Sequence, residues 1–234
     1  MPDSPVALVT AASRGMGAAI ARRLSADGYR LVLMSRSEDV LELANELDAI
    51  GVTGSVASPT DLQTFVDRAL SEYGRIDAMV CNTGHPPKGD LLDVSDADWH
   101  DGLDLALLNT VRLARLLVPV METQGGGAFV NVSTFGAVEP SLSFPVSSAI
   151  RSALGAFVKL FADRYGAAGI RMNSVLPGFI ETYDVDEATL ARIPVGRAGG
   201  VEEIAATVAF LLSEGGAYIT GQSVVVDGGL TRSI

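Results

Sequence analysis

Residues 6–17 read VALVTAASRGMG: an apolar and β-branched run from Val6 to Thr10 leads into small residues and two glycines, Gly15 and Gly17. Such a run predicts a buried parallel strand that passes through a short loop into a helix. In this arrangement glycines let the backbone approach a pyrophosphate, whose charge the free N–H groups at the helix start stabilise. The stretch therefore predicts a dinucleotide-binding βαβ unit, with a plain tight turn as the alternative.

Short apolar runs alternate with segments of helical period along the whole chain. Several runs are continuously apolar, which is typical of parallel strands covered on both faces. With right-handed helical crossovers they predict an α/β fold: one doubly wound, Rossmann-like parallel sheet with helices on both faces, in a single domain of residues 1–234. The seven predicted strands are residues 6–10, 30–35, 53–57, 78–82, 128–133, 171–176 and 222–226.

Six helices are expected between these strands. The first follows Gly15, the second runs to Ile50 and ends at Gly51, and the third stops at Gly74. A glycine commonly follows the last helical turn, which supports these ends. Helical spacing of apolar residues then predicts helices over 96–121, 147–165 and 201–213.

The chain carries 17 lysine and arginine residues against 28 aspartate and glutamate residues, a formal net charge of −11. Nucleic acids and anionic membrane surfaces repel such a protein, so neither is expected as a partner. No apolar stretch reaches the about 18 residues of a membrane span, and the start from Met1 to Pro5 has no basic leader, so we expect a cytoplasmic protein. The single cysteine, Cys81, excludes an intrachain disulfide and a cysteine-based metal site, and no metal is expected.

Further motifs follow the glycine loop in order. Together with residues 10–17 they resemble the motifs of the short-chain dehydrogenase/reductase family, in particular its 3-oxoacyl-ACP-reductase-like members, over nearly the whole chain. The resemblance implies the predicted fold, a nicotinamide dinucleotide cofactor and a small-molecule substrate. The motifs are Cys81-Asn82-Thr83-Gly84 after the fourth strand, Asn131-Val132-Ser133-Thr134 after the fifth, and residues 173–182 after the sixth.

Charge at the end of the second strand indicates which cofactor is bound. An acidic residue there binds the ribose of NAD, whereas a basic one accommodates the 2′-phosphate of NADP. The strand ends Met34-Ser35-Arg36, without a carboxylate, and Arg14 lies in the glycine loop. Both arginines can form bidentate contacts with a phosphate, although solvated surface arginines are the alternative. We therefore predict NADP(H) rather than NAD(H).

Two positions of the implied cofactor site depart from the family. Ala11 replaces the first loop glycine, and Ser55 stands where relatives usually carry an adenine-contacting aspartate. The cofactor-binding residues that the resemblance implies are Thr10, Ser13, Arg14, Gly15, Met16, Gly17, Ser35, Arg36, Ser55, Val56, Asn82, Gly84, Arg151, Pro177, Gly178, Ile180 and Thr182.

The catalytic set of the family is altered at every position that the resemblance assigns. A tyrosine and a lysine four residues apart become Ser147 and Arg151, the serine after the fifth strand becomes Thr134, and an asparagine of the preceding helix becomes Ala106. In the family the lysine holds the nicotinamide ribose, and the tyrosine transfers a proton while the cofactor transfers hydride. The tetrad is therefore degenerate.

These changes predict a rerouted proton transfer. Thr134 keeps a hydroxyl for a substrate oxygen, and Arg151 keeps a positive charge for a ribose without exchanging protons near neutrality. Ser147 is too short to reach a substrate carbonyl without a bridging water. His85 follows the fourth strand, at the edge where ligands bind in open α/β sheets, and its imidazole titrates near neutrality. It is either a catalytic donor or a surface residue.

Two lesser candidates complete the site. Asn109 lies nearly one helical turn after Ala106 and can partly replace the missing amide. Tyr183, directly after Thr182, begins a short segment that borders the expected pocket.

Three functions remain open. The favoured one is an NADP(H)-dependent oxidoreductase that acts on a carbonyl or an imine; a protonated iminium needs hydride but no acid at the heteroatom. The second is a non-redox enzyme on the same scaffold, such as a lyase, isomerase or cyclase. The third is a catalytically inactive cofactor-binding protein.

We also expect a homo-oligomer, a tetramer or a dimer. The fourth and fifth helices carry more apolar residues than one buried helix face uses, and the resemblance implies pairing through these helices. The residues are Leu105, Leu108, Leu113, Leu116, Leu117, Phe157, Leu160 and Phe161.

Overall fold

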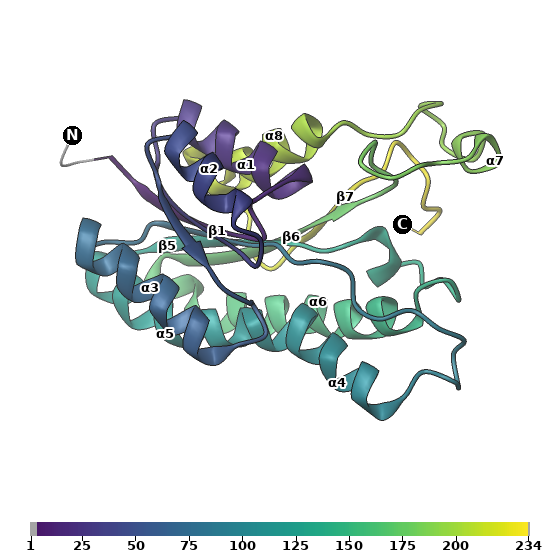
Figure 1. The fold of residues 1–234 in the computed structure, drawn as a ribbon, viewed down its shortest axis with the longest axis horizontal. Helices are drawn as coiled ribbons and strands as arrows, with labels where there is room; N and C mark the ends of the chain where they lie inside the picture. The colour runs from purple at the N-terminus through teal and green to yellow at the C-terminus, as the bar shows by residue number, and fades with distance from the viewer. Residues whose placement is uncertain (1–3, 234) are drawn as a thin grey trace.

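The computed structural model describes residues 4–233, and its centre is one sheet of seven parallel strands in the order β3-β2-β1-β4-β5-β6-β7 (Figure 1). The strand order reverses beside β1, and in such sheets ligands bind at the carboxyl ends of the strands at that point. The predicted doubly wound α/β sheet is confirmed. The strands are β1 (Val6–Thr10), β2 (Arg30–Ser35), β3 (Ile50–Thr53), β4 (Ala78–Cys81), β5 (Gly127–Val132), β6 (Ile170–Pro177) and β7 (Ser223–Val226).

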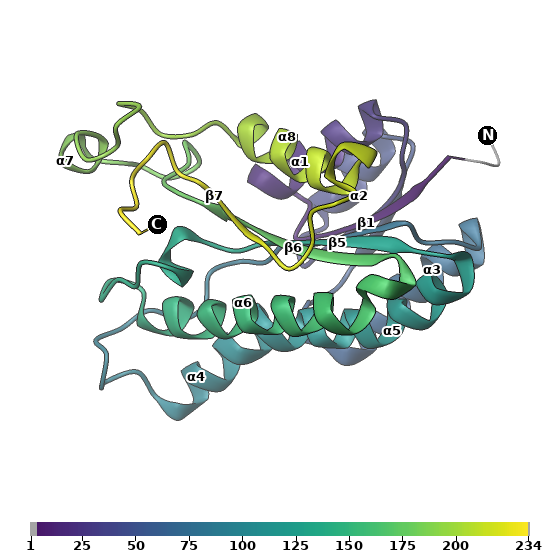
Figure 2. The ribbon, with the colours of Figure 1, turned by 180° about the vertical axis from the view of Figure 1, so that it is seen from behind.

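Helices cover both faces of the sheet, as Figures 1 and 2 show from opposite sides. One face holds α1 (Gly15–Ala26), α2 (Asp39–Glu46) and α8 (Val201–Leu212). The other holds α3 (Pro59–Tyr73), α5 (Asn109–Gln124) and α6 (Pro145–Tyr165), with α4 (Asp96–Leu103) before α5. A short helix, α7 (Glu187–Leu190), follows β6, and single 3₁₀ turns occupy Phe135–Ala137, Gly166–Ala168 and Glu214–Gly216.

Strand β1 shows why the sequence folds into three layers. Its side chains alternate between two cores: Ala7 and Val9 pack with α1 and α8, whereas Val6 and Leu8 pack with α3 and α5. All four are fully buried. Removing each larger one from water contributes about 1.5 to 3 kcal/mol. The continuous apolar run is therefore the signature of a central strand, as predicted.

The third strand and the second helix differ from their predicted bounds. The strand is Ile50–Thr53, not residues 53–57, and α2 ends at Glu46, before Ile50. The chain reverses at Asp48, whose φ is 51°, and Ile50 then enters the sheet. Gly51 is not a helix stop: a Cβ there would lie 2.8 Å from Leu41 Cδ2, so the glycine lets α2 pack closely on the strand.

The predicted helix over 96–121 is interrupted. Residues Asp104–Leu108 form a π-helical turn between α4 and α5, and α5 extends to Gln124. A π turn inserts one extra residue into a helix and often marks a functional site. Ala106 lies in this turn and packs against Val146 and Ile150. Helix α6 begins at Pro145 rather than at residue 147, because proline fits the first turn of a helix.

Within residues 4–233 no helix is both long enough and apolar enough to cross a membrane. The same residues contain no group of three or more histidine, cysteine or acidic side chains placed to hold a metal ion.

Candidate active site

The carboxyl ends of β1 and β4 are joined by a side chain. Thr10 Oγ1 accepts a hydrogen bond from Asn82 N at 2.9 Å and donates to Asn82 O at 2.7 Å. Asn82 Nδ2 then donates to Ala11 O at 3.2 Å. These bonds fix the loop after β1 at the sheet edge. Thr10 and Asn82 therefore lie beside the glycine loop, and their polar groups shape it.

The glycine loop brings its backbone very close to α1. A Cβ on Gly17 would fall 2.2 Å from Ala11 O, so only glycine fits at that position. Gly15 has a φ of 56°, in the left-handed region that glycine tolerates. Ala11 has a φ of 47°, which is unfavourable for a residue with a Cβ. The loop therefore keeps the conformation of a glycine-rich loop, with strain at Ala11.

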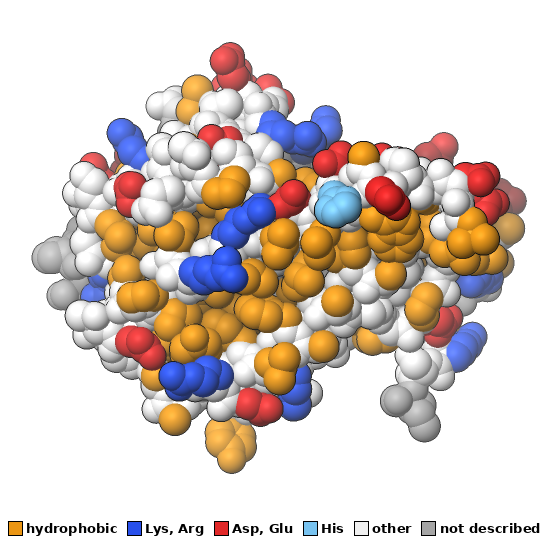
Figure 3. Space-filling model, turned by 90° about the horizontal axis from the view of Figure 1, so that it is seen from below, with side chains coloured by type: hydrophobic (Ala, Val, Ile, Leu, Met, Phe, Trp, Pro, Cys, Tyr) orange, Lys and Arg blue, Asp and Glu red, His pale blue; other side chains and the backbone are white. Residues whose placement is uncertain are grey.

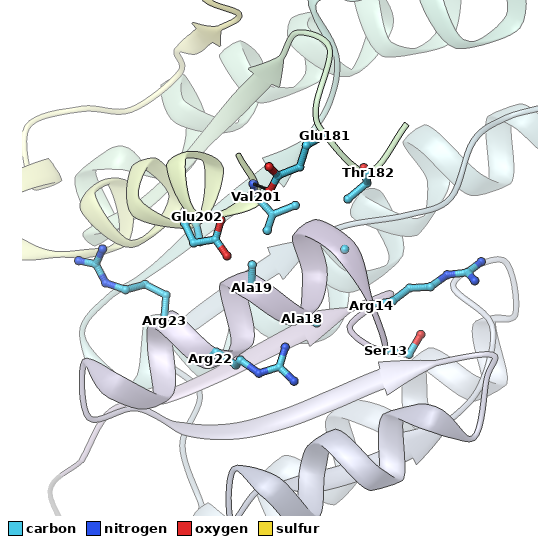
Figure 4. Close-up of a pocket in the computed structure, with 12 residues that line it drawn as sticks. Ser13, Arg14, Ala18, Ala19, Arg22, Arg23, Glu181, Thr182, Val201 and Glu202 are labelled. Carbon is cyan, nitrogen blue, oxygen red and sulfur yellow. Dashed lines mark hydrogen bonds between the residues drawn. The ribbon is translucent and has the colours of Figure 1, made fainter. Parts of the chain in front are cut away.

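An open groove of about 710 Å³ borders this loop (Figure 4). Ser13, Arg14 and Gly15 line one end, and Thr182 reaches toward them from the segment after β6. Thr182 Cγ2 lies 3.6 Å from the position of a Cβ on Gly15. Away from the sheet edge, the groove continues between α1 and the start of α8. The start of α1, where free N–H groups attract anions, is thus open to a ligand.

The two arginines predicted to bind phosphate lie near this edge. Arg36 Nη2 is 4.0 Å from the position of a Cβ on Gly84, so its side chain reaches from the end of β2 to the loop after β4. Arg14 lines the groove. Ser13 and Ser35 connect their two loops by a hydrogen bond of 3.0 Å between their hydroxyl oxygens. Among residues 4–233, neither arginine forms an ion pair with a carboxylate.

The predicted adenine contacts follow β3. Ser55 N donates to Asp61 Oδ2 at 2.8 Å, and Ser55 Oγ accepts from Ala57 N at 3.2 Å. Val56 is buried beside them. The carboxylate of Asp61, a residue of α3, therefore lies next to Ser55. This carboxylate already accepts a hydrogen bond from the backbone N–H of Ser55.

The remaining predicted cofactor residues lie at two places along the edge. Met16 is in the first turn of α1 and packs against the core beneath it. Pro177 ends β6, and Gly178 follows it with no room for a side chain, since a Cβ would be 2.7 Å from Asp227 Cα. Ile180 is buried. These residues therefore lie close to the sheet edge, where they pack against the protein's own core and backbone.

Arg151 is the most unusual charged residue of the site. Its side chain is 5% exposed, and Nη1 donates to Val132 O, at the end of β5, at 2.8 Å. Burial lowers the pKa of the guanidinium to about 10, against the opposing effect of Tyr183, so it stays charged at neutral pH. Ser147 lies one turn earlier in α6 and is also buried. Arg151 and Ser147 are therefore together, as the Tyr-x-x-x-Lys spacing implies.

Two hydroxyl residues, Ser133 and Thr134, follow β5. Thr134 Oγ1 accepts a long hydrogen bond, 3.4 Å, from Gly136 N, which leaves its own proton for another acceptor. Within the described part of the chain, the buried Ser133 Oγ has no hydrogen-bond partner. Ser133 is therefore a further hydroxyl residue beside Thr134, and two adjacent hydroxyl residues after a strand are a visible signal in the sequence.

The asparagine position is apolar in this protein. Ala106 is 2% exposed, and its methyl side chain can neither donate nor accept a hydrogen bond. Asn109 does not replace it, because its Nδ2 donates to Leu105 O at 2.6 Å and its Oδ1 accepts from Thr110 Oγ1 at 3.0 Å. Both polar groups of Asn109 are thus used inside the helix.

His85 has a partner that the sequence could not show. Its Nε2 lies 2.5 Å from Tyr183 Oη, and the two rings meet edge to face. Burial first, and then the positive charges of Arg151 and Lys88, lower the pKa of the imidazole from its ordinary 6.5. Lys88 Nζ itself lies 4.9 Å from the centre of the Phe144 ring. The basic side chains of Arg151, from α6, and of His85 and Lys88, from the loop after β4, therefore lie at one edge of the site.

Known proteins resemble this chain over its whole length. The family model described as Enoyl-(Acyl carrier protein) reductase matches residues 10–231. Human dehydrogenase/reductase SDR family member 4 is 35% identical over 96% of this chain and 86% of that protein. The 3-oxoacyl-[acyl-carrier-protein] reductase FabG of Escherichia coli (strain K12) is 32% identical over 97% of this chain and 98% of that protein.

A solved structure agrees in three dimensions. L-sorbose reductase from Gluconobacter frateurii, crystallised in complex with NADPH and L-sorbose, superposes with a TM-score of 0.93 at 29% identity, over 99% of this chain and 98% of that one. The motifs, the sheet order and these matches agree along the whole chain. The protein belongs to the short-chain dehydrogenase/reductase family of oxidoreductases.

Proposed function

We propose that the protein is an NADP(H)-dependent oxidoreductase that reduces a carbonyl or an imine. The observation that carries the proposal is the buried Arg151. A charge removed from water costs several kcal/mol unless it is paired, yet no carboxylate among residues 4–233 forms an ion pair with Arg151. A ligand rich in hydroxyl and phosphate oxygens would supply the missing partners.

NADP(H) fits the residues at the sheet edge. The N–H groups at the start of α1, with Gly15 and Gly17, would hold the pyrophosphate, and Thr182 would close over it. Arg36, with Arg14, would hold the 2′-phosphate through charge-assisted bonds. The L-sorbose reductase neighbour binds NADPH, which supports this cofactor. When bound, the reduced nicotinamide supplies a hydride.

The altered tetrad keeps two of its tasks. Arg151 would hold the nicotinamide ribose, because its guanidinium stays charged and is fixed by Val132 O. Thr134 would bond the substrate oxygen with its free hydroxyl proton. Ser147 is too short for direct donation and acts, at most, through a water. An iminium substrate suits such a site, because it needs no acid.

The surface supports a homo-oligomer. Figure 3 shows hydrophobic side chains gathered on the face that carries the helices below the sheet in Figure 1. Of the apolar residues expected at a subunit interface, Leu113, Leu117 and Phe161 are instead buried in the core of the chain. Leu160 is 68% exposed on α6. Light scattering of the purified protein should give the mass of a dimer or tetramer; a monomer at micromolar concentration contradicts assembly.

The activity test follows NADPH absorbance while ketones, aldehydes and cyclic imines are added in turn, with L-sorbose included because the structural neighbour is a sorbose reductase. The proposal predicts substrate-dependent oxidation of NADPH, faster with imines than with ketones. Tight NADPH binding without turnover of any compound would instead support the inactive cofactor-binding protein. No binding of either nicotinamide cofactor would favour the non-redox enzyme.

A further inference from the structure

The pair formed by Tyr183 and His85 joins two distant parts of the chain. The 2.5 Å contact between Tyr183 Oη and His85 Nε2 spans 98 positions of sequence. The rings reinforce it, with centroids 5.3 Å apart in an edge-on arrangement. Tyr183 is 47% exposed. The contact ties the segment after β6 to the loop after β4.

The pair lies at the active site. Thr182, directly before Tyr183, contacts the position above Gly15 in the cofactor loop. On the other side, the charge of Arg151 is close enough to interact with both partners of the pair. The segment that carries Tyr183 also places Phe179 against Phe135, with ring centroids 5.5 Å apart, next to Thr134. Tyr183 thus lies between the cofactor loop and the altered tetrad.

We propose that Tyr183 is the proton donor of the reductase, and that His85 returns the proton to it from solvent. The inference rests on the proposed function and completes it, because it replaces the tyrosine that is missing at Ser147. A phenol gives up a proton far more readily than a serine hydroxyl. The positive charge of Arg151 favours the negative charge that forms on the phenol oxygen as the proton leaves.

The step balances in atoms and charge. A hydride, which the reduced cofactor would supply, would form a C–H bond at the carbonyl carbon while the C=O π bond breaks. The electron pair of that bond takes the Tyr183 proton, which forms the O–H bond of the alcohol. The tyrosinate would then take the proton of His85 Nε2 while Nδ1 takes a proton from solvent in the same step, so that no imidazolate forms, and exchange with solvent would restore the Nε2–H tautomer. Because its pKa is lowered, the imidazole is neutral at pH 7 and can donate from Nε2 only as that tautomer.

The sharpest test compares two substrates in one variant. Tyr183→Phe removes the proton but keeps the ring, so it should reduce kcat for a ketone by about 100-fold or more. The same variant should reduce an N-alkyl iminium salt at the wild-type rate, since that substrate needs no acid, and its NADPH affinity should be unchanged. Tyr218→Phe is the matched control, because Tyr218 is fully exposed and its variant should behave as the wild type.

Each result decides between defined outcomes. Equal loss on ketone and iminium, or no loss on the ketone, would overturn the proton-donor role while leaving the proposed function standing. A wild-type protein that reduces neither substrate would contradict the proposed function itself. His85→Gln should lower kcat on the ketone alone, and less than Tyr183→Phe, because water can slowly reprotonate the phenol.

A titration of the protein without cofactor tests the pair independently of activity. The chain has two histidines, His85 and His100, so both are resolved by NMR. The relay requires the Nε2–H tautomer of His85, donating to Tyr183. Losing this acceptor in Tyr183→Phe should lower the pKa of His85 further. An unprotonated Nε2 in the wild type, or an unchanged His85 pKa, would overturn the relay.

Discussion

The guanidinium of Arg151 in α6 donates a hydrogen bond of 2.8 Å to Val132 O at the end of β5. This bond holds a buried cation at the end of the strand that Ser133 and Thr134 follow. Because the cation has no acidic partner in the described structure, it is costly to the folded protein. We propose that this cost is offset when Arg151 binds the cofactor.

Arg151→Met should therefore separate stability from binding. An apolar side chain of similar length removes the desolvated charge, which outweighs one lost hydrogen bond, so the free energy of unfolding should rise by about 1 kcal/mol. NADPH affinity should fall about tenfold or more, the loss of one charge-assisted contact. Thermal unfolding and cofactor titration measure the two effects. A less stable variant with full affinity would show that Arg151 is structural.

The strain at Ala11 gives a second prediction. A left-handed φ costs an alanine about 1 to 2 kcal/mol, whereas glycine loses about 0.4 to 1 kcal/mol through greater chain entropy. Ala11→Gly should therefore raise the free energy of unfolding by up to about 1 kcal/mol. Ala19→Gly, in the interior of α1, is the control and should lower it by a similar amount. Urea denaturation compares them, and two equal losses would mean that the loop relaxes around Ala11.

Cys81 should be chemically inert in the folded protein. The thiol is buried at the end of β4, and burial raises its pKa to about 12. The reactive thiolate is therefore suppressed by folding, and raising the pH through the ordinary range near 9 favours the unfolded state. A thiol reagent at pH 8 should label Cys81 only as urea unfolds the chain. Rapid labelling of the native protein would contradict this burial.

Restoring the family pair is a fourth test. Ser147→Tyr with Arg151→Lys should create or raise ketone reduction, because the two positions lie one turn apart on the buried side of α6. Ser147→Ala should cost little activity in the native background. If the double variant binds NADPH normally and reduces nothing, the shape of the pocket limits the reaction, rather than the absence of a tyrosine at position 147.

The central fold could be predicted because its signals are local. The apolar run of β1, the glycines after it and the helical spacing of α1 each constrain a few neighbouring residues. The predicted bounds of helices and strands were wrong where a tertiary contact determines the local structure. Gly51 looks like a helix stop in sequence but serves the packing of Leu41 on β3. The π turn at Asp104–Leu108 has no distinct sequence signal.

The site could be predicted only in part for the same reason. The positions of Thr134, Ser147 and Arg151 follow from order along the chain, and the structure brings them to one edge. The contact between His85 and Tyr183 depends on the path of the segment after β6, which local sequence does not define. Asn109 does not replace the missing asparagine amide, because its Nδ2 donates a hydrogen bond to Leu105 O in the preceding turn.

Cofactor binding tests the account most directly. We expect fluorescence titration to show that NADPH binds more tightly than NADH. Arg36→Asp should then weaken NADPH by about 2 kcal/mol and leave NADH nearly unchanged, since only NADPH carries the 2′-phosphate. Arg68→Asp, at an exposed arginine of α3, should alter neither. Absence of binding to either cofactor, or equal losses of both in Arg36→Asp, would contradict the claim that this site holds NADP(H).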